Sequence, residues 1–149
     1  MKILILSDNH YKDLDDINYN DYDYVVHAGD YGNSLIDLEL NNVIFVRGNC
    51  DSSGPIDESF EINGKKFYLT HGHYYDVKNG YERLILRGTL KNVNFVIFGH
   101  THRPDLVLQE GIVYINPGSY QNGYYVELTD KHISFFKDGK MYKQFENRW

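Results

Sequence analysis

The sequence has little of several residue types, and each shortage excludes a class of protein. Its 149 residues include one cysteine, three prolines, two methionines and one tryptophan. A single cysteine cannot form an internal disulfide, so nothing in the sequence requires an oxidising compartment. Basic residues number 15 against 21 acidic ones, and the net charge of -6 argues against a long nucleic-acid interface, which needs clustered Lys and Arg.

Long apolar runs and biased tracts are missing as well. The first ten residues, MKILILSDNH, hold a four-residue apolar run that is too short for a signal peptide or a membrane span. We find no linker, internal repeat or low-complexity tract. We therefore expect residues 1–149 to form one cytoplasmic domain with no membrane partner, and we leave open whether copies associate as a homo-oligomer.

The sequence does contain several short, wholly apolar segments. Four of them predict strands covered on both faces, at residues 3–6, 24–26, 43–46 and 95–98. Asn63-Gly64 and Asp138-Gly139 each lie between two strand-like runs and predict β-hairpins. From residue 103 onward, strands follow one another without a helix between them.

Two segments have helical spacing. Residues 33–42 predict a short helix whose apolar face is made of Leu35, Ile36 and Leu38. Residues 79–90 predict a second helix with apolar positions at Tyr81, Leu84, Ile85 and Leu90. Residues 11–23 are polar and predict only a short or irregular helix. Alternating strands and helices at the start and an antiparallel meander at the end indicate a mixed α/β (α+β) fold.

Polar residues follow five apolar strands at their C-terminal ends. The segments ILIL, YVV, VIFV, KFYLT and FVIF precede SDNH, HAGD, RGNCD, HGH and GHTH, and these loops hold every histidine except His132. Ligands of open α/β sheets bind at this edge, because short loops converge there on one crevice. Taken singly, each cluster is also typical of a turn or of a hydrogen-bonded histidine at the core edge. Five clusters at one sheet edge together indicate a metal site.

The donor atoms suggest which metals such a site would take. Imidazole nitrogens mixed with carboxylate oxygens suit Mn²⁺, Fe²⁺, Zn²⁺ or Co²⁺, whereas a Ca²⁺ site would be all oxygen. Two such cations about 3.5 to 4 Å apart clamp a phosphoryl group and lower the pKa of a bridging water towards neutrality. A small phosphorylated ligand held by metal is therefore compatible with the acidic composition.

The ordered set SDNH, HAGD, GNCD, HGH, GHTH and NPGS, spread over residues 7–119, closely resembles the calcineurin-like metallophosphoesterases, specifically their small single-domain bacterial and archaeal phosphodiesterase branch. The resemblance implies two stacked mixed β-sheets flanked by helices. It also implies a hydrolase whose metal-bridging hydroxide attacks a small phosphodiester. The implied cofactor is two divalent transition metals, for which we expect Mn²⁺, with Ni²⁺, Fe²⁺, Zn²⁺ or Co²⁺ as alternatives.

Transferred residue by residue, the resemblance assigns seven metal ligands. They are Asp8, His10 and His102 for one metal, Asn49, His71 and His100 for the other, and Asp30 as the bridge that holds the hydroxide. His27 and Asp51 are expected to orient ligands through hydrogen bonds, with a structural role equally open for His27. His73 is expected to contact phosphate or donate a proton. Gly48 and Gly99 are expected to let the backbone turn at strand ends.

Three residues near the expected site need separate interpretation. Cys50 stands where the superfamily commonly has a histidine that helps to protonate the leaving group, which leaves the general acid open. Because the ligand role falls to Asn49, we expect Cys50 to be a small packing residue. Tyr11 replaces a usual glycine and is expected to narrow the mouth of the site. Arg103 either meets substrate charge or, as is commoner for such residues, forms a surface salt bridge.

Other functions share part of this evidence. One alternative is a protein-binding scaffold with little catalysis, since a eukaryotic trafficking subunit has this fold; scaffold members lose ligands, however, and all seven are present here. A phosphomonoesterase is another alternative. A nuclease is disfavoured by the acidic charge and the small size.

Overall fold

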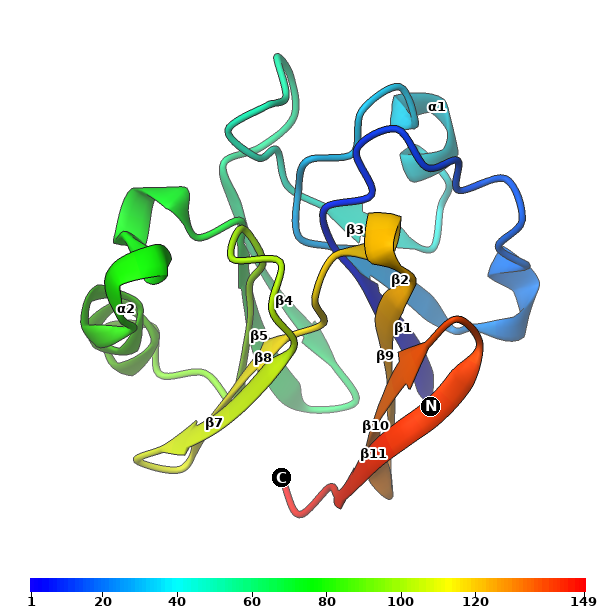
Figure 1. Ribbon diagram of the computed structural model, residues 1–149. Helices are drawn as coiled ribbons and strands as arrows, with labels where there is room; N and C mark the ends of the chain where they lie inside the picture. Colours follow the sequence, from blue (N-terminus) through cyan, green and yellow to red (C-terminus); the bar gives the residue numbers. More distant parts are fainter.

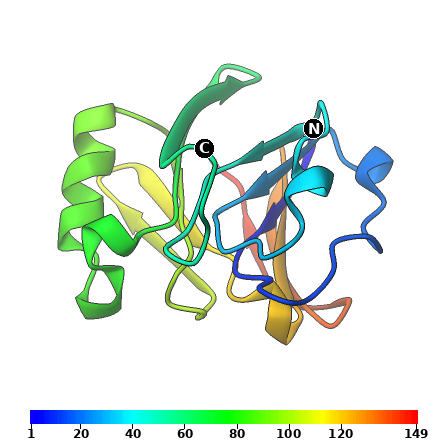
Figure 2. The same cartoon turned by 90° about the horizontal axis from the view of Figure 1, so that it is seen from above.

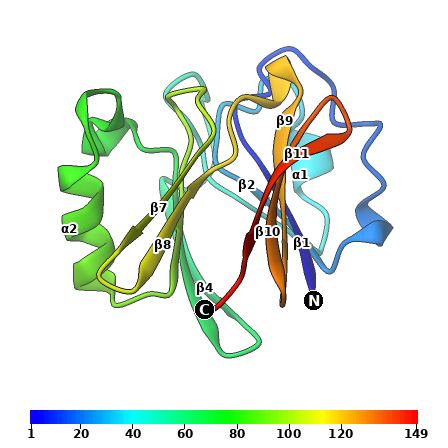
Figure 3. The ribbon, with the colours of Figure 1, turned by 60° about the horizontal axis from the view of Figure 1, so that its bottom comes forward.

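Two β-sheets stack face to face, with a helix outside each of them (Figures 1 and 3). This computed structural model describes residues 1–149 except for the side chains of Leu35 and Ile36. The predicted contributions of those two side chains to a helix face therefore lie outside the described residues. Seen from above, the two helices lie on opposite outer sides of the stacked sheets (Figure 2).

The first sheet has six strands in the order β11-β10-β9-β1-β2-β3. Their bounds are β1 (Lys2–Leu6), β2 (Tyr24–His27), β3 (Val43–Phe45), β9 (Tyr124–Thr129), β10 (His132–Lys137) and β11 (Lys140–Glu146). Strands β1, β2 and β3 are parallel, and the pairs β1-β9, β9-β10 and β10-β11 are antiparallel. The predicted hairpin at 138–139 joins β10 to β11.

The second sheet has five strands in the order β4-β5-β6-β8-β7. Their bounds are β4 (Asp57–Ile62), β5 (Lys65–Thr70), β6 (Phe95–Ile97), β7 (Asp105–Gln109) and β8 (Ile112–Asn116). Strands β5, β6 and β8 are parallel, whereas β4 and β7 are antiparallel edge strands. Both sheets are thus mixed, which confirms the predicted fold class. The predicted hairpin at 63–64 joins β4 to β5.

Helices are few and short. The bounds are α1 (Leu35–Leu38) and α2 (Glu82–Lys91), with 3-10 turns η1 (Tyr19–Asp21), η2 (His73–Tyr75), η3 (Val77–Asn79) and η4 (Tyr120–Asn122). Both predicted helices are present, and the polar segment 11–23 forms only η1 and turns. None of the described helices is long and apolar enough to cross a membrane.

The continuous apolar runs are explained by burial of both faces of each sheet. Along β1, Ile3 and Ile5 face the core between the sheets, while Leu4 and Leu6 pack in a second cluster on the outer face. This alternation follows from the two-residue period of a strand. Partly buried tyrosines, including Tyr22 and Tyr125, border the outer cluster, so several of the 14 tyrosines lie at the core edge.

Helix α2 covers the outer face of the five-stranded sheet through one ridge. Leu84 is fully buried there, with Ile85 and Tyr81 packed at its edge. The prediction for Leu90 was wrong, because that side chain is 70% exposed. Six residues after Leu84, it lies on the far side of a helix with 3.6 residues per turn.

The five polar loops meet at one end of the molecule, but they come from two sheets. The loops after β1, β2 and β3 belong to the first sheet, and those after β5 and β6 belong to the second. The prediction of a single sheet edge was therefore wrong in detail. Because the two sheets are stacked, the loops of one sheet face those of the other across the top of the sandwich, and both chain termini lie at the other end (Figure 1).

Candidate metal centre

Asp8 lies at the centre of the first group of polar side chains. Its Oδ1 is 3.2 Å from Nε2 of His102 and 3.8 Å from Nε2 of His10, and those two nitrogens are 3.2 Å apart. Its Oδ2 accepts hydrogen bonds from the Ser7 hydroxyl and from the backbone N–H of His100. The aspartate is thereby fixed with one oxygen towards the imidazoles.

A second group lies beside the first. Nε2 of His71 is 3.0 Å from Oδ1 of Asn49 and 3.2 Å from Nδ1 of His100. Nδ1 of His71 donates to the carbonyl of Ala28 at 2.7 Å, which assigns the ring proton to Nδ1 and leaves the Nε2 lone pair facing the other donors.

Asp30 lies between the two groups. Its Oδ2 is 3.4 Å from Nε2 of His71 and 3.9 Å from Nε2 of His10, one histidine from each group. Its Oδ1 accepts the backbone N–H of Cys50 at 3.0 Å. All seven residues with predicted ligand roles are thus brought together, although the division between two metals stays a prediction.

The donor atoms fit a cation. Oδ1 of Asp8 is buried and has no hydrogen-bond partner among the described residues, although three imidazole Nε2 atoms lie within 3.9 Å of it. A buried carboxylate oxygen without a partner is costly. Lone pairs of oxygen and nitrogen that converge on one space need positive charge between them, and a divalent metal supplies it.

The charges of the side chains are consistent with this arrangement. Burial raises the pKa of Asp30, but the interaction with His71 lowers it by a larger amount. The pKa of this carboxyl group therefore lies well below its usual range. Burial lowers the pKa of His71, and the carboxylates of Asp30 and Asp8 raise it overall. Burial lowers the pKa of His100 to about 4, and the neighbouring His71 and Lys78 act in the same direction. Carboxylates therefore stay ionised, and His100 stays neutral, near neutral pH.

Five of the seven ligand candidates have left-handed backbone conformations. Positive φ angles of 47° to 71° occur at Asp8, His10, Asp30, His100 and His102. Such angles are uncommon for residues other than glycine and cluster where function requires them. These five residues lie in the loops after β1, β2 and β6, where the left-handed conformation bends the backbone shortly after the strand ends.

Asp51 and His27 stabilise these loops by bonding to their backbone. The Asp51 carboxylate accepts N–H groups of Asp30, Tyr31 and Gly48 at 2.7, 3.1 and 2.6 Å. His27 is fully buried, where burial lowers its pKa to about 4, and its Nδ1 accepts the N–H of Gly29. The predicted orienting role of Asp51 thus has a structural basis, and His27 contacts the loops from inside.

Sequence analysis missed Asn9, which joins two loops. Its Oδ1 accepts from Nε2 of His27 at 2.7 Å, and its amide donates to the carbonyls of Lys12 and Tyr31. The position of Asn9 between the ligand candidates Asp8 and His10 could have indicated this role, because a polar side chain in a buried loop needs hydrogen-bond partners.

Gly48 and Gly99 have a different role from the predicted one. Neither has a positive φ angle. A Cβ on Gly48 would overlap the Asp30 carboxylate, and one on Gly99 would overlap the Ser7 hydroxyl. The glycines are needed for close approach of neighbouring loops rather than for a sharp turn.

The remaining predicted residues border the centre. The His73 ring lies 5.3 Å from that of His71 between centroids, and its Nδ1 is buried without a partner among the described residues. The Cys50 thiol is exposed, which contradicts its expected role in packing, and it lies within 4.8 Å of ligand atoms of His10 and Asp30. Tyr11 is 90% exposed and lines a cavity of about 400 Å³ beside His10.

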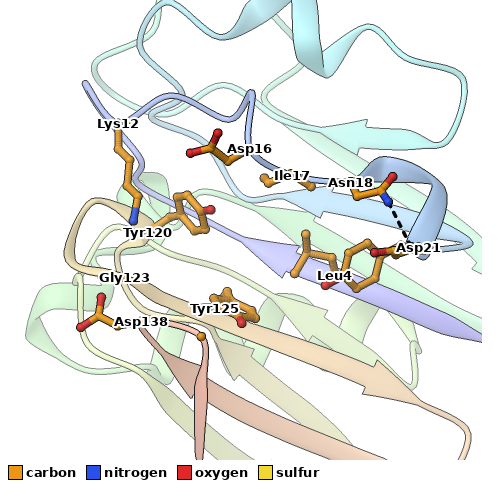
Figure 4. A pocket seen from close by; sticks show the side chains of 12 residues that line it. Leu4, Lys12, Asp16, Ile17, Asn18, Asp21, Tyr120, Gly123, Tyr125 and Asp138 are labelled. Atoms are coloured by element: carbon orange, nitrogen blue, oxygen red, sulfur yellow. Dashed lines mark hydrogen bonds between the residues drawn. The ribbon is translucent and has the colours of Figure 1, made fainter.

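A further cavity, of about 380 Å³, lies on the outer face of the six-stranded sheet (Figure 4). Tyrosines and aspartates line much of it, including Tyr120, Tyr125 and Asp138, and the Lys12 ammonium lies 4.6 Å from the centroid of the Tyr120 ring. None of the described residues that line it is a ligand candidate. This cavity is therefore separate from the metal centre.

The chain matches the calcineurin-like phosphoesterase superfamily domain over residues 1–133. It belongs to the calcineurin-like phosphoesterase superfamily. Among superfamily members, a probable metallophosphoesterase of Mycoplasma pneumoniae is 35% identical over 126 residues, which cover 80% of this chain and 79% of the relative. A phosphodiesterase of Methanocaldococcus jannaschii is 30% identical over 144 residues, with coverage of 79% and 83%.

Solved structures share the architecture of this superfamily member. Vps29 of Entamoeba histolytica in complex with Zn²⁺ gives a TM-score of 0.79 at 22% identity, covering 98% of this chain and 99% of Vps29. Identity this low shows the fold alone. The sequence relatives are metallophosphoesterases and phosphodiesterases, so membership implies divalent-metal binding and hydrolysis of phosphoesters.

Proposed function

We propose that the protein is a phosphodiesterase that hydrolyses a small phosphodiester at a centre of two divalent metals, Mn²⁺ foremost, with Ni²⁺, Fe²⁺, Zn²⁺ or Co²⁺ as alternatives. The observation that carries the proposal is the position of Asp30, whose Oδ2 lies between His10 of one donor group and His71 of the other. When bound, two metals supply Lewis-acid chemistry, since they neutralise phosphoryl charge and lower the pKa of water held between them.

In this proposal the chain holds one metal through each donor group. The first group is Asp8, His10 and His102, the second is Asn49, His71 and His100, and Asp30 serves both. The hydrogen bonds from the Ser7 hydroxyl to Asp8 and from Nδ1 of His71 to the Ala28 carbonyl fix the ligands before metal arrives. Such preorganisation lowers the cost of binding the transition state.

His73 is the proposed phosphate contact or proton donor. Hydrolysis adds water to phosphorus and breaks the bond to one ester oxygen, which leaves as an alcohol once it receives a proton. His73 is only partly buried and neighbours both His71 and His100, with centroid distances of 5.3 and 6.0 Å. An imidazole there can donate that proton or bind a phosphoryl oxygen.

Variants of two ligands test the proposal. With Mn²⁺ added, the wild-type protein should hydrolyse bis(p-nitrophenyl) phosphate, and Asp30→Asn or His71→Ala should reduce hydrolysis to background. His132→Ala is the matched control, because His132 is the one histidine outside the polar loops. Full activity in both ligand variants, measured on folded and purified protein, would refute the assigned site.

A protein-binding scaffold is the second candidate function, favoured by the likeness of the fold to Vps29. The complete set of seven donors weighs against it. Absence of bound metal and of metal-stimulated hydrolysis would favour the scaffold.

Comparing the hydrolysis of p-nitrophenyl phosphate with that of its diester would detect a phosphomonoesterase. The single domain over residues 1–149, the cytoplasmic location and any homo-oligomer stay predictions.

A further inference from the structure

A cavity of about 460 Å³ beside the metal centre is lined by two basic side chains. The described residues that line it are Val77, Lys78, Gly80, Tyr81, Thr101 and Arg103, and none of them is acidic. Lys78 comes from η3, and Arg103 directly follows the ligand candidate His102. Thr101 stands between His100 and His102 in the chain, so the cavity adjoins the loop that carries both.

Neither basic side chain is neutralised within the part of the chain that the structure describes. No ion pair and no side-chain hydrogen bond of Lys78 or Arg103 is present there. The predicted surface salt bridge of Arg103 is therefore wrong. Asp105 lies next to this lining, because its oxygens accept from the hydroxyl of the lining residue Tyr81 at 2.6 Å and from the Leu106 N–H at 2.9 Å, but it forms no ion pair with Lys78 or Arg103.

Among the described residues, Lys2 and Arg148 are the only lysine or arginine side chains in an ion pair, so an unpaired basic side chain is common in this chain. Lys78 and Arg103 differ from the other basic residues because both are exposed and line one cavity that has no carboxylate in its lining. Together, these features indicate a place for a negative group next to the reacting phosphate.

The cavity beside His10 has a different character. Its lining includes Tyr11, Asn33 and Ser52, and none of the described residues that line it is lysine or arginine. The two spaces that adjoin the ligand loops therefore differ in charge. A substrate with two different ester arms would bind in one orientation, with its more negative arm near Lys78 and Arg103.

We propose that Lys78 and Arg103 bind a second phosphate group of the substrate, so that the substrate is a phosphodiester with a further phosphate on one ester arm. The guanidinium of Arg103 presents paired N–H donors to phosphate oxygens, and the Lys78 ammonium adds a point charge. This inference rests on the proposed phosphodiesterase function and names its substrate class.

Two substrates that differ by one phosphate test it. They are the 5′-(p-nitrophenyl phosphate) ester of thymidine and the same compound with a 3′-phosphate, both assayed with Mn²⁺. The 3′-phosphate should raise kcat/KM by about tenfold, as expected for one charge-assisted contact. Lys78→Met and Arg103→Met keep the apolar stems, and each should bring the ratio of the two kcat/KM values towards one. Lys131→Met, at an exposed lysine in the β9-β10 turn, should keep the wild-type ratio.

Binding provides a readout that does not require turnover. Calorimetry on the Mn²⁺-loaded protein should give a Kd about tenfold lower for thymidine 3′,5′-bisphosphate than for thymidine 5′-monophosphate, a difference that both methionine variants lose. Equal kcat/KM and equal Kd for the paired ligands in the wild type would overturn this inference alone. So would a ratio that survives in both variants. No hydrolysis of either ester by the wild type would instead refute the proposed function.

Discussion

At the scale of single residues, the side chain of Asp51 orders the loop that carries Asp30. The N–H groups of Asp30 and Gly48 donate to Oδ2 of Asp51, and that of Tyr31 donates to Oδ1. Asp51→Asn keeps the size of the side chain but replaces one of these oxygens by an NH₂ group, which cannot accept, so at least one of the three N–H groups loses its acceptor. We expect the free energy of unfolding to fall by about 2 kcal/mol and Mn²⁺ affinity to fall about tenfold or more.

Urea denaturation and calorimetric titration with Mn²⁺ measure these two effects of Asp51→Asn. Asp130→Asn is the control, because Asp130 is an exposed carboxylate that pairs with the N-terminal amine. A variant that binds Mn²⁺ as tightly as the wild type would contradict the orienting role of Asp51.

Cys50, the neighbour of Asp51, contributes to the site through its backbone. Its N–H donates to Oδ1 of Asp30, whereas its exposed thiol accepts from the Asn49 amide at 3.5 Å. Cys50→Ala and Cys50→Ser both keep the N–H, so we expect wild-type metal content and most of the activity. Elemental analysis of the purified variants measures the content. Loss of one metal equivalent from Cys50→Ala would show that the thiol is a ligand.

At the scale of elements, α2 is held by a single buried ridge. Leu84 is fully buried, and Gly88, one turn later, lies against Tyr114, while Leu90 is exposed. Leu84→Ala should lower the free energy of unfolding by about 2 to 5 kcal/mol, because it leaves a cavity. Leu90→Ala should change it by less than about 0.5 kcal/mol. Denaturant titrations compare the two variants, and equal losses would contradict this assignment of the helix faces.

Local patterns were sufficient to predict the elements but not how they pair. Apolar runs at 3–6 and 95–98 and the Asn63-Gly64 turn predict β1, β6 and the β4-β5 hairpin, because strands and tight turns are set by neighbouring residues. The insertion of β8 between β6 and β7, and the pairing of β9 with β1, depend on contacts between distant residues. No short-range pattern contains that information.

The candidate site was predictable to a similar degree. Side chains at strand ends, such as Asp8 and His71, follow from the strand pattern and from the resemblance to a family. The role of Lys78 and the exposure of Cys50 do not, because each depends on which loop faces it from another part of the chain. Asn9 is intermediate, since its place between two ligand candidates marks it, but its partner His27 comes from the end of β2. The ligands are therefore more predictable than the residues that select a substrate.

At the scale of the whole molecule, charge is distributed unevenly on an acidic chain. The net charge of -6 repels an anionic substrate in general, whereas Lys78 and Arg103 provide unpaired positive charge beside the ligand loops. The outer-face cavity is lined by the carboxylates of Asp16, Asp21 and Asp138 and by one basic residue, Lys12 (Figure 4). An anion is thus attracted more strongly towards Lys78 and Arg103 than towards the outer face, and this steering weakens as salt is added.

Metal binding should also stabilise the whole fold, because the donors of the centre come from both sheets. Without a cation, the buried carboxylates of Asp8 and Asp30 lie close to each other and to the lone pair of His71, and this contact between electron-rich atoms destabilises the fold. Ligand present at 100 times its Kd stabilises the native state by about 2.7 kcal/mol per site. For a chain of this size, two sites should raise the midpoint of thermal unfolding by about 10 to 20 °C relative to protein in EDTA. Differential scanning calorimetry measures the shift. Asp8→Asn should lose much of it and His132→Ala should keep it, whereas an equal midpoint for wild-type protein with Mn²⁺ and with EDTA would contradict a centre that joins the two sheets.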